Sequence, residues 1–216
     1  MRSYISIFPV LLFMSCVGLF KYPVPKSLKY AMNCYDSTYT GLDTMINIHG
    51  YYTQMNVSDK HGKFKYVNGE LVEIGIDTTY LNVMFYEDGI FIRNLGFQDY
   101  AASEGLEKMK REGRTFNSRS EYHGTYKVSG DTVKTQFISQ GFGNVWFAME
   151  VWYRIIDKST LQLFFSKHLA LEGPDRKNPD FQPKFIKDAP YAKFVYVEEI
   201  PESDSWLKKE DWFWCK

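Results

Sequence analysis

The stretch that decides the fold reads Val145-Trp-Phe-Ala-Met-Glu-Val-Trp-Tyr-Arg-Ile-Ile156, then Asp157-Lys-Ser159, then Thr160-Leu-Gln-Leu-Phe-Phe-Ser-Lys167. Every second residue of the first run, starting from Val145, is apolar, which is the period of a β-strand with one buried face. The turn residues between the two runs predict a hairpin. Leu161, Leu163 and Phe165 continue the apolar face on the returning strand. We expect this hairpin to belong to a sheet that is buried on one side.

Two further hairpins are predicted earlier in the chain. Residues 81–86 lead through Glu87-Asp88-Gly89 into residues 90–93. An Asp-Gly pair between two β-rich runs is the strongest short-range hairpin signal. Residues 126–128 lead through Ser129-Gly130-Asp131 into the run that starts at Thr132.

The second of these turns also predicts a register. A two-residue loop at Gly130 and Asp131 would pair Val128 with Val133, and Tyr126 with Thr135. Further strands are predicted at residues 45–55 and around residue 195. The chain is therefore predicted to be all-β, an antiparallel meander of about eight strands that closes into a barrel.

Three segments interrupt or follow the strands. Residues 101–113 predict a short polar helix or a long loop, and residues 172–190, which hold four prolines, predict a loop. Residues 203–215 open with helix-capping side chains and predict a short C-terminal helix. We expect its tryptophans to pack on the outer barrel wall near Trp146 and Trp152, and a membrane or protein contact is the alternative. These tryptophans are Trp206, Trp212 and Trp214.

The hairpin motifs resemble those of the lipocalin-like (calycin-type) domains of small bacterial lipoproteins. The resemblance spans residues 45–197, and Tyr52 stands in the Gly50-Tyr-Tyr52 run where the lipocalins have the Trp of a Gly-x-Trp motif. It implies an eight-stranded barrel that in some members holds an apolar ligand. The motifs that carry it are Phe85-Tyr-Glu-Asp-Gly-Ile90, Gly124-Thr-Tyr-Lys-Val-Ser-Gly-Asp-Thr-Val133 and Trp152-Tyr-Arg-Ile-Ile-Asp-Lys-Ser-Thr-Leu161.

The barrel interior is the predicted binding site. Side chains on the inferred inner face would give an apolar wall with phenol hydroxyls, which suits a small amphipathic ligand. The alternative is that the same side chains fill the barrel as core, and that the protein is a structural or interaction protein of the envelope. The predicted lining residues are Tyr52, Phe85, Tyr126, Phe137, Met149, Tyr153 and Phe165.

The N-terminus predicts export and lipid attachment. Arg2 precedes an apolar run, and Phe13-Met-Ser-Cys16 resembles the bacterial lipobox, in which the cysteine becomes the acylated first residue. Residues 1–15 are then a signal peptide, residues 16–42 a tether and N-terminal segment, and residues 43–216 the barrel domain. A poor spanning helix, an ordinary cleaved signal and a buried first element are the alternatives.

The predicted location is the cell envelope. No acidic residue occurs among residues 17–23, directly after Cys16, which favours the periplasmic face of the outer membrane. Two cysteines then remain, Cys34 and Cys215, one near each end of the mature chain. In an oxidising compartment such a pair is expected to form a disulfide, and two free thiols are the alternative.

Composition and motifs exclude several other classes. Lys and Arg number 26 and Asp and Glu number 26, so no basic field favours nucleic acid. No cofactor motif, metal-ligand spacing or nucleophile elbow is found, and we expect no enzyme. Glu121 and His123 precede a predicted strand and are interpreted as exposed polar residues rather than a catalytic pair.

Overall fold

A computed structural model of the chain describes residues 23–35, 45–67, 70–93, 102–113, 115, 121–140, 145–172 and 182–215. Cys16 and the predicted signal peptide lie outside these ranges. The elements in chain order are α1 (Lys26–Ala31), β1 (Gly50–Val67), β2 (Glu70–Phe85), β3 (Ile90–Arg93), α2 (Ala102–Arg111), β4 (Tyr122–Ser129), β5 (Thr132–Gln140), β6 (Trp146–Asp157), β7 (Thr160–Glu172), β8 (Lys184–Phe185), β9 (Tyr191–Tyr196), and the 3₁₀ helices η2 (Trp206–Lys209) and η3 (Asp211–Phe213).

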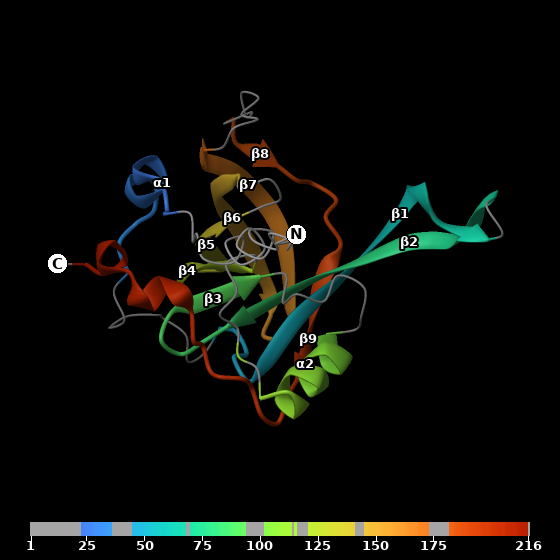
Figure 1. The fold of residues 1–216 in the computed structure, drawn as a ribbon. Coiled ribbons are helices and arrows are strands. Elements are labelled where there is room, and N and C mark those ends of the chain that lie inside the picture. The colour runs from blue at the N-terminus through green and yellow to red at the C-terminus, as the bar shows by residue number, and fades with distance from the viewer. Residues whose placement is uncertain are drawn as a thin grey trace, which may run out of the picture.

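The strands form a closed antiparallel barrel (Figure 1). Strands β1 to β7 each pair with the next strand in the chain. Strand β9 pairs with both β7 and β1 and so closes the barrel, while β8 adds a short strand beside β7. The predicted all-β meander of about eight strands is thus confirmed.

The predicted hairpins are confirmed in detail. Val128 pairs with Val133 and Tyr126 with Thr135, as the two-residue loop requires. Gly89 and Gly130 have φ values of 83° and 59°, a left-handed conformation that glycine adopts without the steric cost of a side chain. The hairpin turns at residues 86–89, 130–131 and 158–159 lie at one end of the barrel, which we call the hairpin end. The opposite end, where β3 and β5 end and β6 begins, is the loop end.

The barrel wall separates two apolar clusters. The inner cluster is built on Phe85, Phe91, Phe137 and Tyr153, and each of these side chains is at most 1% exposed. The outer cluster forms where α1, α2 and the C-terminal segment cover the wall, and its members include Leu28, Trp146 and Trp206. Each strand therefore contributes alternate side chains to two buried environments.

The C-terminal segment packs on the outer wall, as predicted for Trp206. Its ring centroid lies 5.9 Å from that of Trp146. Trp152 contacts other rings, on β7, and not the C-terminal tryptophans. The predicted helix consists of the two short 3₁₀ helices, and Ser205 at the start of η2 makes no side-chain capping bond.

The N-terminal and C-terminal segments are joined to each other. Cys34 and Cys215 form a disulfide, as the cysteine pair predicts. Tyr35 N–H donates to the backbone oxygen of Phe213 over 2.6 Å, and Cys215 N–H donates to the backbone oxygen of Tyr35 over 2.9 Å. The described part of the predicted tether, residues 23–35, is therefore packed against the barrel, with Leu28 fully buried.

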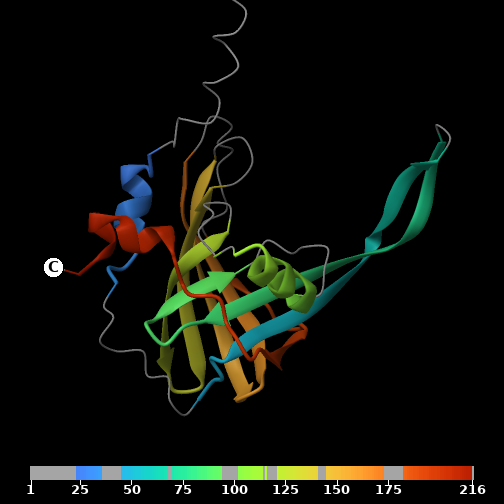
Figure 2. The same ribbon diagram turned by 60° about the horizontal axis from the view of Figure 1, so that its bottom comes forward.

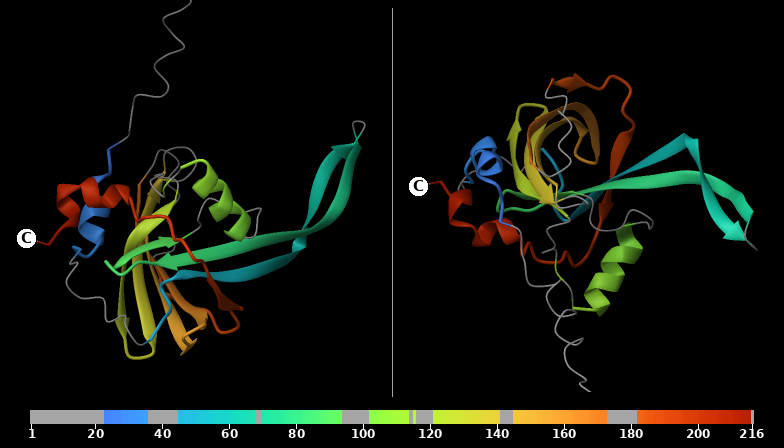
Figure 3. Two further views of the ribbon diagram at one scale, coloured as in Figure 1. Left: turned by 90° about the horizontal axis from the view of Figure 1, so that it is seen from below. Right: turned by 45° about the horizontal axis from the view of Figure 1, so that its top comes forward.

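Strands β1 and β2 extend far beyond the barrel (Figures 2 and 3). β1 pairs with β9 only over residues 50–53, and β2 pairs with β3 only over residues 83–85. The remaining pairs, from Gln54 and Leu81 outward, join β1 to β2 alone in the described sheet. The sequence predicted a first strand at residues 45–55 and gave no sign of this long projecting hairpin. The polar segment near residue 105 forms the helix α2, one of its two predicted states.

Candidate functional site

Six of the seven predicted lining residues lie on the inner face of the barrel. Five of them belong to the inner cluster and are at most 3% exposed, and Met149 packs against that cluster as a partly buried side chain. Phe165 does not share this position. The inner five are Tyr52, Phe85, Tyr126, Phe137 and Tyr153.

Phe165 lies on the outer face, which corrects the sequence prediction. It pairs with Trp152 and stacks on that ring with centroids 4.3 Å apart. The strict alternation fails because the register of β7 shifts between the partners of Trp152 and Tyr153, where Phe164 is an extra residue. Such a bulge turns the following side chains to the opposite face of the sheet. Nothing in the residue pattern of the strand reveals this insertion.

Aromatic rings fill the hairpin end of the interior. Phe85 is 1% exposed, and its ring centroid lies 4.8 Å from that of Tyr126 and 5.9 Å from that of Tyr52. Phe91 lies 5.5 Å away, and Tyr153 lies 6.5 Å away in an edge-to-face arrangement. Rings at these separations are in packing contact. This end of the barrel is therefore core.

Two tyrosine hydroxyls fasten the hairpin end. Tyr52 donates to the backbone oxygen of Lys158 over 2.6 Å and accepts from the N–H of Asn47 over 2.9 Å. Tyr126 donates to the backbone oxygen of Tyr86 over 2.7 Å. Burial, opposed in part by the Asn47 hydrogen bond, raises the pKa of Tyr52 to about 12. Burial also raises the pKa of Tyr126, chiefly by removing water from its hydroxyl.

Tyr52→Phe should alter the alkaline stability of the protein. The unfolded phenol releases its proton near pH 10, whereas the folded one holds it to about pH 12. The contribution of protonated Tyr52 to the free energy of unfolding is therefore fully present below pH 10 and is lost as the pH rises through 12. Between pH 10 and 12 the unfolding free energy of the variant should fall less steeply than that of the wild type, by up to about 1.4 kcal/mol per pH unit. Denaturant unfolding at pH 9, 10 and 11 measures this slope. Tyr30→Phe, at a side chain 85% exposed, is the control, and an unchanged slope in Tyr52→Phe would contradict the expectation.

Polar side chains lie on the inner face as well. Arg93 pairs with Val83 of the inner cluster, and its guanidinium carbon lies 5.5 Å from the centroid of the Phe137 ring. His168 pairs with Met149, so both side chains point inward. Three buried atoms here have no hydrogen-bond partner among the described residues: Nε of Arg93, Oη of Tyr153 and Nδ1 of His168.

The surroundings of these polar groups are aromatic. Tyr122 stacks on Phe137 with centroids 5.2 Å apart, and Phe147 meets Tyr122 edge-on at 5.4 Å. The pKa of the fully buried Tyr153 is raised by burial, and the nearby charge of Arg93 opposes that rise. The interior thus contains the guanidinium of Arg93 and the imidazole of His168 toward the loop end, and the phenol of Tyr153 nearer the hairpin end, among aromatic rings. A guanidinium and a phenol hydroxyl are groups that hydrogen-bond to anionic oxygens.

Of these polar residues, Tyr153 was predicted from the sequence, but Arg93 and His168 were not. Arg93 follows Phe91 by two positions in a predicted strand, which places both side chains on one face. His168 had no such signal, because the register shift at Phe164 decides which face of β7 it lies on.

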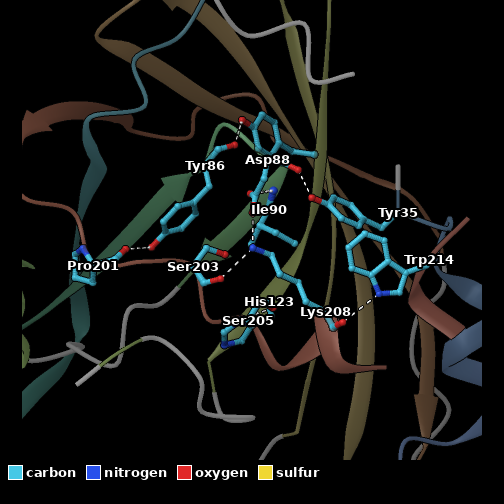
Figure 4. Close-up of polar contacts among 11 residues, drawn as sticks. Tyr35, Tyr86, Asp88, Ile90, His123, Pro201, Ser203, Ser205, Lys208 and Trp214 are labelled. Atoms are coloured by element: carbon cyan, nitrogen blue, oxygen red, sulfur yellow. Dashed lines mark hydrogen bonds and ion pairs between the residues drawn. The ribbon is translucent and has the colours of Figure 1, made fainter. Parts of the chain in front are cut away.

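A second group of polar contacts fastens the C-terminal segment to the outer wall (Figure 4). Lys208 forms an ion pair with Asp88 and donates to the backbone oxygen of Ser203 over 3.0 Å. Tyr35 donates its hydroxyl to the backbone oxygen of Asp88, and Tyr86 donates to that of Pro201 over 3.1 Å. Because these residues are hydrogen-bonded to one another, we interpret the contacts as structural. We call the set Tyr35, Tyr86, Asp88, Pro201, Ser203 and Lys208 the clasp. A hollow of about 430 Å³ lies beside it, lined by Ile48, His49, Tyr86, Glu87, Asp88, Ile200, Pro201, Glu202, Ser203 and Lys208.

Glu121 and His123 are buried in this region, so their interpretation as exposed residues is wrong. Nε2 of His123 lies 3.1 Å from Oε2 of Glu121, and Nδ1 lies 3.1 Å from Oγ of Ser205. His123 and Ser205 are both 0% exposed. The three side chains resemble a catalytic triad only in composition, because a hydroxyl without access to solvent cannot meet a substrate. They satisfy one another's polar atoms beneath the C-terminal segment.

The described residues include no group of three His, Cys, Asp or Glu side chains placed to bind a metal ion. Over the same part of the chain, no helix has the length and apolar character needed to cross a membrane. Comparison of the chain with models of known families, with curated proteins and with solved structures gave no match. The resemblance carried by the hairpin motifs therefore stays a prediction.

Proposed function

We propose that this chain is a lipid-anchored, lipocalin-like binding protein of the bacterial envelope, and that it holds a small amphipathic anion beside Arg93 in the interior of its barrel. One observation carries this proposal: buried atoms of Arg93, Tyr153 and His168 on the inner face have no hydrogen-bond partner within the described part of the chain. A buried polar atom without a partner costs about 1–3 kcal/mol, and a ligand oxygen that accepts hydrogen bonds from these groups would remove that cost.

The chemistry of the three side chains selects an anionic group. Arg93 carries a permanent positive charge, and a guanidinium binds carboxylate, sulfonate or phosphate oxygens through more than one N–H. Tyr153 offers a hydroxyl donor whose burial keeps it protonated. The stacked rings of Tyr122 and Phe137 would lie against the flat or apolar body of the ligand. The packed hairpin end sets the floor of the site.

The envelope location rests on independent features. Lipid attachment at Cys16 is proposed from the lipobox-like run, with several acyl chains giving firm anchoring. The Cys34–Cys215 disulfide fits an oxidising compartment, as the outer membrane facing the periplasm would be. No nucleic-acid partner and no catalytic activity form part of the proposal.

Two dyes that differ by one anionic group test the site. We expect 1-anilinonaphthalene-8-sulfonate to bind at least about tenfold more tightly than N-phenyl-1-naphthylamine, which lacks the sulfonate, because a charge-assisted hydrogen bond is worth about 1.5–3 kcal/mol. Fluorescence titration of the full-length protein gives both affinities. The protein is kept in detergent at a concentration too low for the detergent itself to bind the dyes. Arg93→Met should remove the preference.

The matched control is Arg154→Met, because this guanidinium lies on the outer face over the ring of Phe164. It should leave both affinities unchanged. Near-UV circular dichroism must show that each variant keeps its tertiary structure. Equal affinity for the two dyes, or the same preference in Arg93→Met as in wild type, would refute an anion site inside the barrel.

A further inference from the structure

A patch of aromatic side chains lies on the outer wall, away from the interior site. We name it the aromatic face and define it as Trp152, Phe164, Phe165 and Phe185. Trp152 stacks on Phe165 at 4.3 Å and meets Phe164 edge-on at 6.1 Å. Phe185 covers Phe165 at 5.3 Å and is itself 70% exposed. Phe165 is 6% exposed and Trp152 and Phe164 are partly buried, so Phe185 is the ring of this face that protrudes to meet another body.

Two local features of the chain build this face. The extra residue in β7 directs both Phe164 and Phe165 outward, toward Trp152 on β6. The short strand β8 then pairs with Phe165 and Ser166, which brings Phe185 onto the same wall. Three phenylalanines and a tryptophan are thereby gathered on adjacent strands. Such an arrangement is costly on a surface that meets only water.

Positive charges border the rings. Nζ of Lys134 lies 4.5 Å from the ring centroid of Trp152, and the guanidinium carbon of Arg154 lies 5.2 Å from that of Phe164. The neighbouring carboxylate of Glu150 already accepts hydrogen bonds from the Trp152 indole at 2.9 Å and the Gln136 amide at 2.7 Å. Two cationic groups, Lys134 and Arg154, and one anionic group, Glu150, therefore border the rings.

The segment that carries Phe185 adds to this field. Lys187 is exposed two positions after Phe185, and the exposed Asp188 follows. The partner that matches flat rings and a cationic border is an anionic membrane surface. Trp and other aromatic side chains favour the interfacial layer of a bilayer, and each nearby Lys or Arg gains attraction to anionic headgroups.

The position of the N-terminal segment points to the same partner. Helix α1 packs on the outer wall of β6 and β7, where Leu28 belongs to one cluster with Ala148 and Ala170. These two strands also carry Trp152, Phe164 and Phe165. Pro23, where the described chain begins, follows Cys16 by seven positions, a distance that the chain spans with at most about 25 Å. A lipid at Cys16 would hold this wall of the barrel close to the bilayer.

We propose that the aromatic face lies on the anionic surface of the membrane and fixes the orientation of the barrel there. This inference rests on the proposed attachment at Cys16 and is independent of the ligand site. With this wall against the bilayer, α2 faces away from it, because α2 and β8 lie on opposite sides of the barrel (Figure 3).

Photo-cross-linking of the full-length, membrane-bound chain tests the orientation. The photoreactive residue p-benzoylphenylalanine replaces one residue in each variant. Phe185→p-benzoylphenylalanine places it in the aromatic face, and Lys108→p-benzoylphenylalanine, on the exposed side of α2, is the matched control. Phe20→p-benzoylphenylalanine reports whether the chain is attached to the membrane near Cys16. Vesicles of phosphatidylglycerol and phosphatidylethanolamine supply the surface. We expect at least about fivefold more lipid cross-linking at position 185 than at position 108. The double variant K134Q/R154Q, or vesicles of phosphatidylcholine alone, should lower the yield at position 185.

Each other outcome overturns the inference. The cross-links at positions 20 and 185 show which part of it fails. Lipid cross-links at position 20 but not at 185 would leave the attachment intact and remove the oriented face. Cross-links from position 185 to a protein in native envelopes would assign the face to a protein partner. No lipid cross-link at either position would refute the attachment itself, and with it the orientation. None of these results bears on dye binding inside the barrel.

Discussion

The double variant Cys34→Ser/Cys215→Ser is expected to lose about 5 kcal/mol of unfolding free energy. The disulfide closes a loop with a sequence separation of 181 residues, and the entropy that such a closure removes from the unfolded chain corresponds to about this value. The loss should be large because the bridge joins the two segments that cover the outer wall. Guanidinium unfolding followed by tryptophan fluorescence measures it.

A reductant supplies the matched control for this prediction. Wild-type protein unfolded in the presence of dithiothreitol should show the stability of the double variant, while the variant itself should be insensitive to the reagent. Wild-type protein whose unfolding midpoint is unaffected by reductant would contradict a structural disulfide. Cys16→Ser should leave the reductant effect unchanged, because Cys16 is not part of the bridge.

Trp206→Ala is expected to cost about 3–5 kcal/mol, the usual range for truncating a buried tryptophan. Its side chain is 7% exposed and contacts the rings of Trp146 at 5.9 Å and His123 at 6.4 Å. Its loss would open the outer cluster beneath the C-terminal segment and weaken the clasp that holds this segment. Thermal and denaturant unfolding provide the measurement.

Trp214→Ala is the control, since this tryptophan is 41% exposed at the same end of the chain. We expect it to cost about 1 kcal/mol or less, even though its indole donates to the backbone oxygen of Lys208 over 3.1 Å. Equal costs for the two tryptophans would mean that the outer cluster does not support the fold in the way the packing indicates.

The hairpins were predictable because each is encoded locally. The Asp88-Gly89 and Gly130-Asp131 pairs demand tight turns, and the two-residue alternation that flanks them decides which side chains are buried. The inner positions of Tyr52, Phe85, Phe137 and Tyr153 follow from that alternation alone. Closure of the barrel by β9 then follows from the number of strands and from the need to pair the two free edges.

The features that sequence reasoning missed depend on contacts between distant segments. Phe165 and His168 lie on the faces opposite to those that strict alternation predicts, because the pairing register of β7 shifts. No residue in β7 indicates that shift. His123 is buried only because Ser205, 82 positions later, returns to cover it. The alternation of a half-buried strand cannot tell an outer wall in water from an outer wall under a second layer. The sequence pattern therefore does not distinguish the inner cluster from the outer cluster.

The candidate site was predictable in part for the same reason. The pattern located the interior and its aromatic lining, but it treated all lining residues as equivalent. In the structure, rings fill the hairpin end, and buried atoms of Tyr153 and of two residues that were not predicted, Arg93 and His168, have no hydrogen-bond partner among the residues described. Arg93 was missed because a charged residue at the end of a strand ordinarily points to solvent.

Native mass spectrometry of the full-length protein, extracted gently from its own membrane, tests the ligand-holding barrel most directly. The expected result is a reproducible bound mass that is lost on denaturation, that ionises as an acid and that is absent from the Arg93→Met variant. A spectrum that shows only the polypeptide and its covalent lipid, identical for wild type and Arg93→Met, would contradict a ligand-holding barrel.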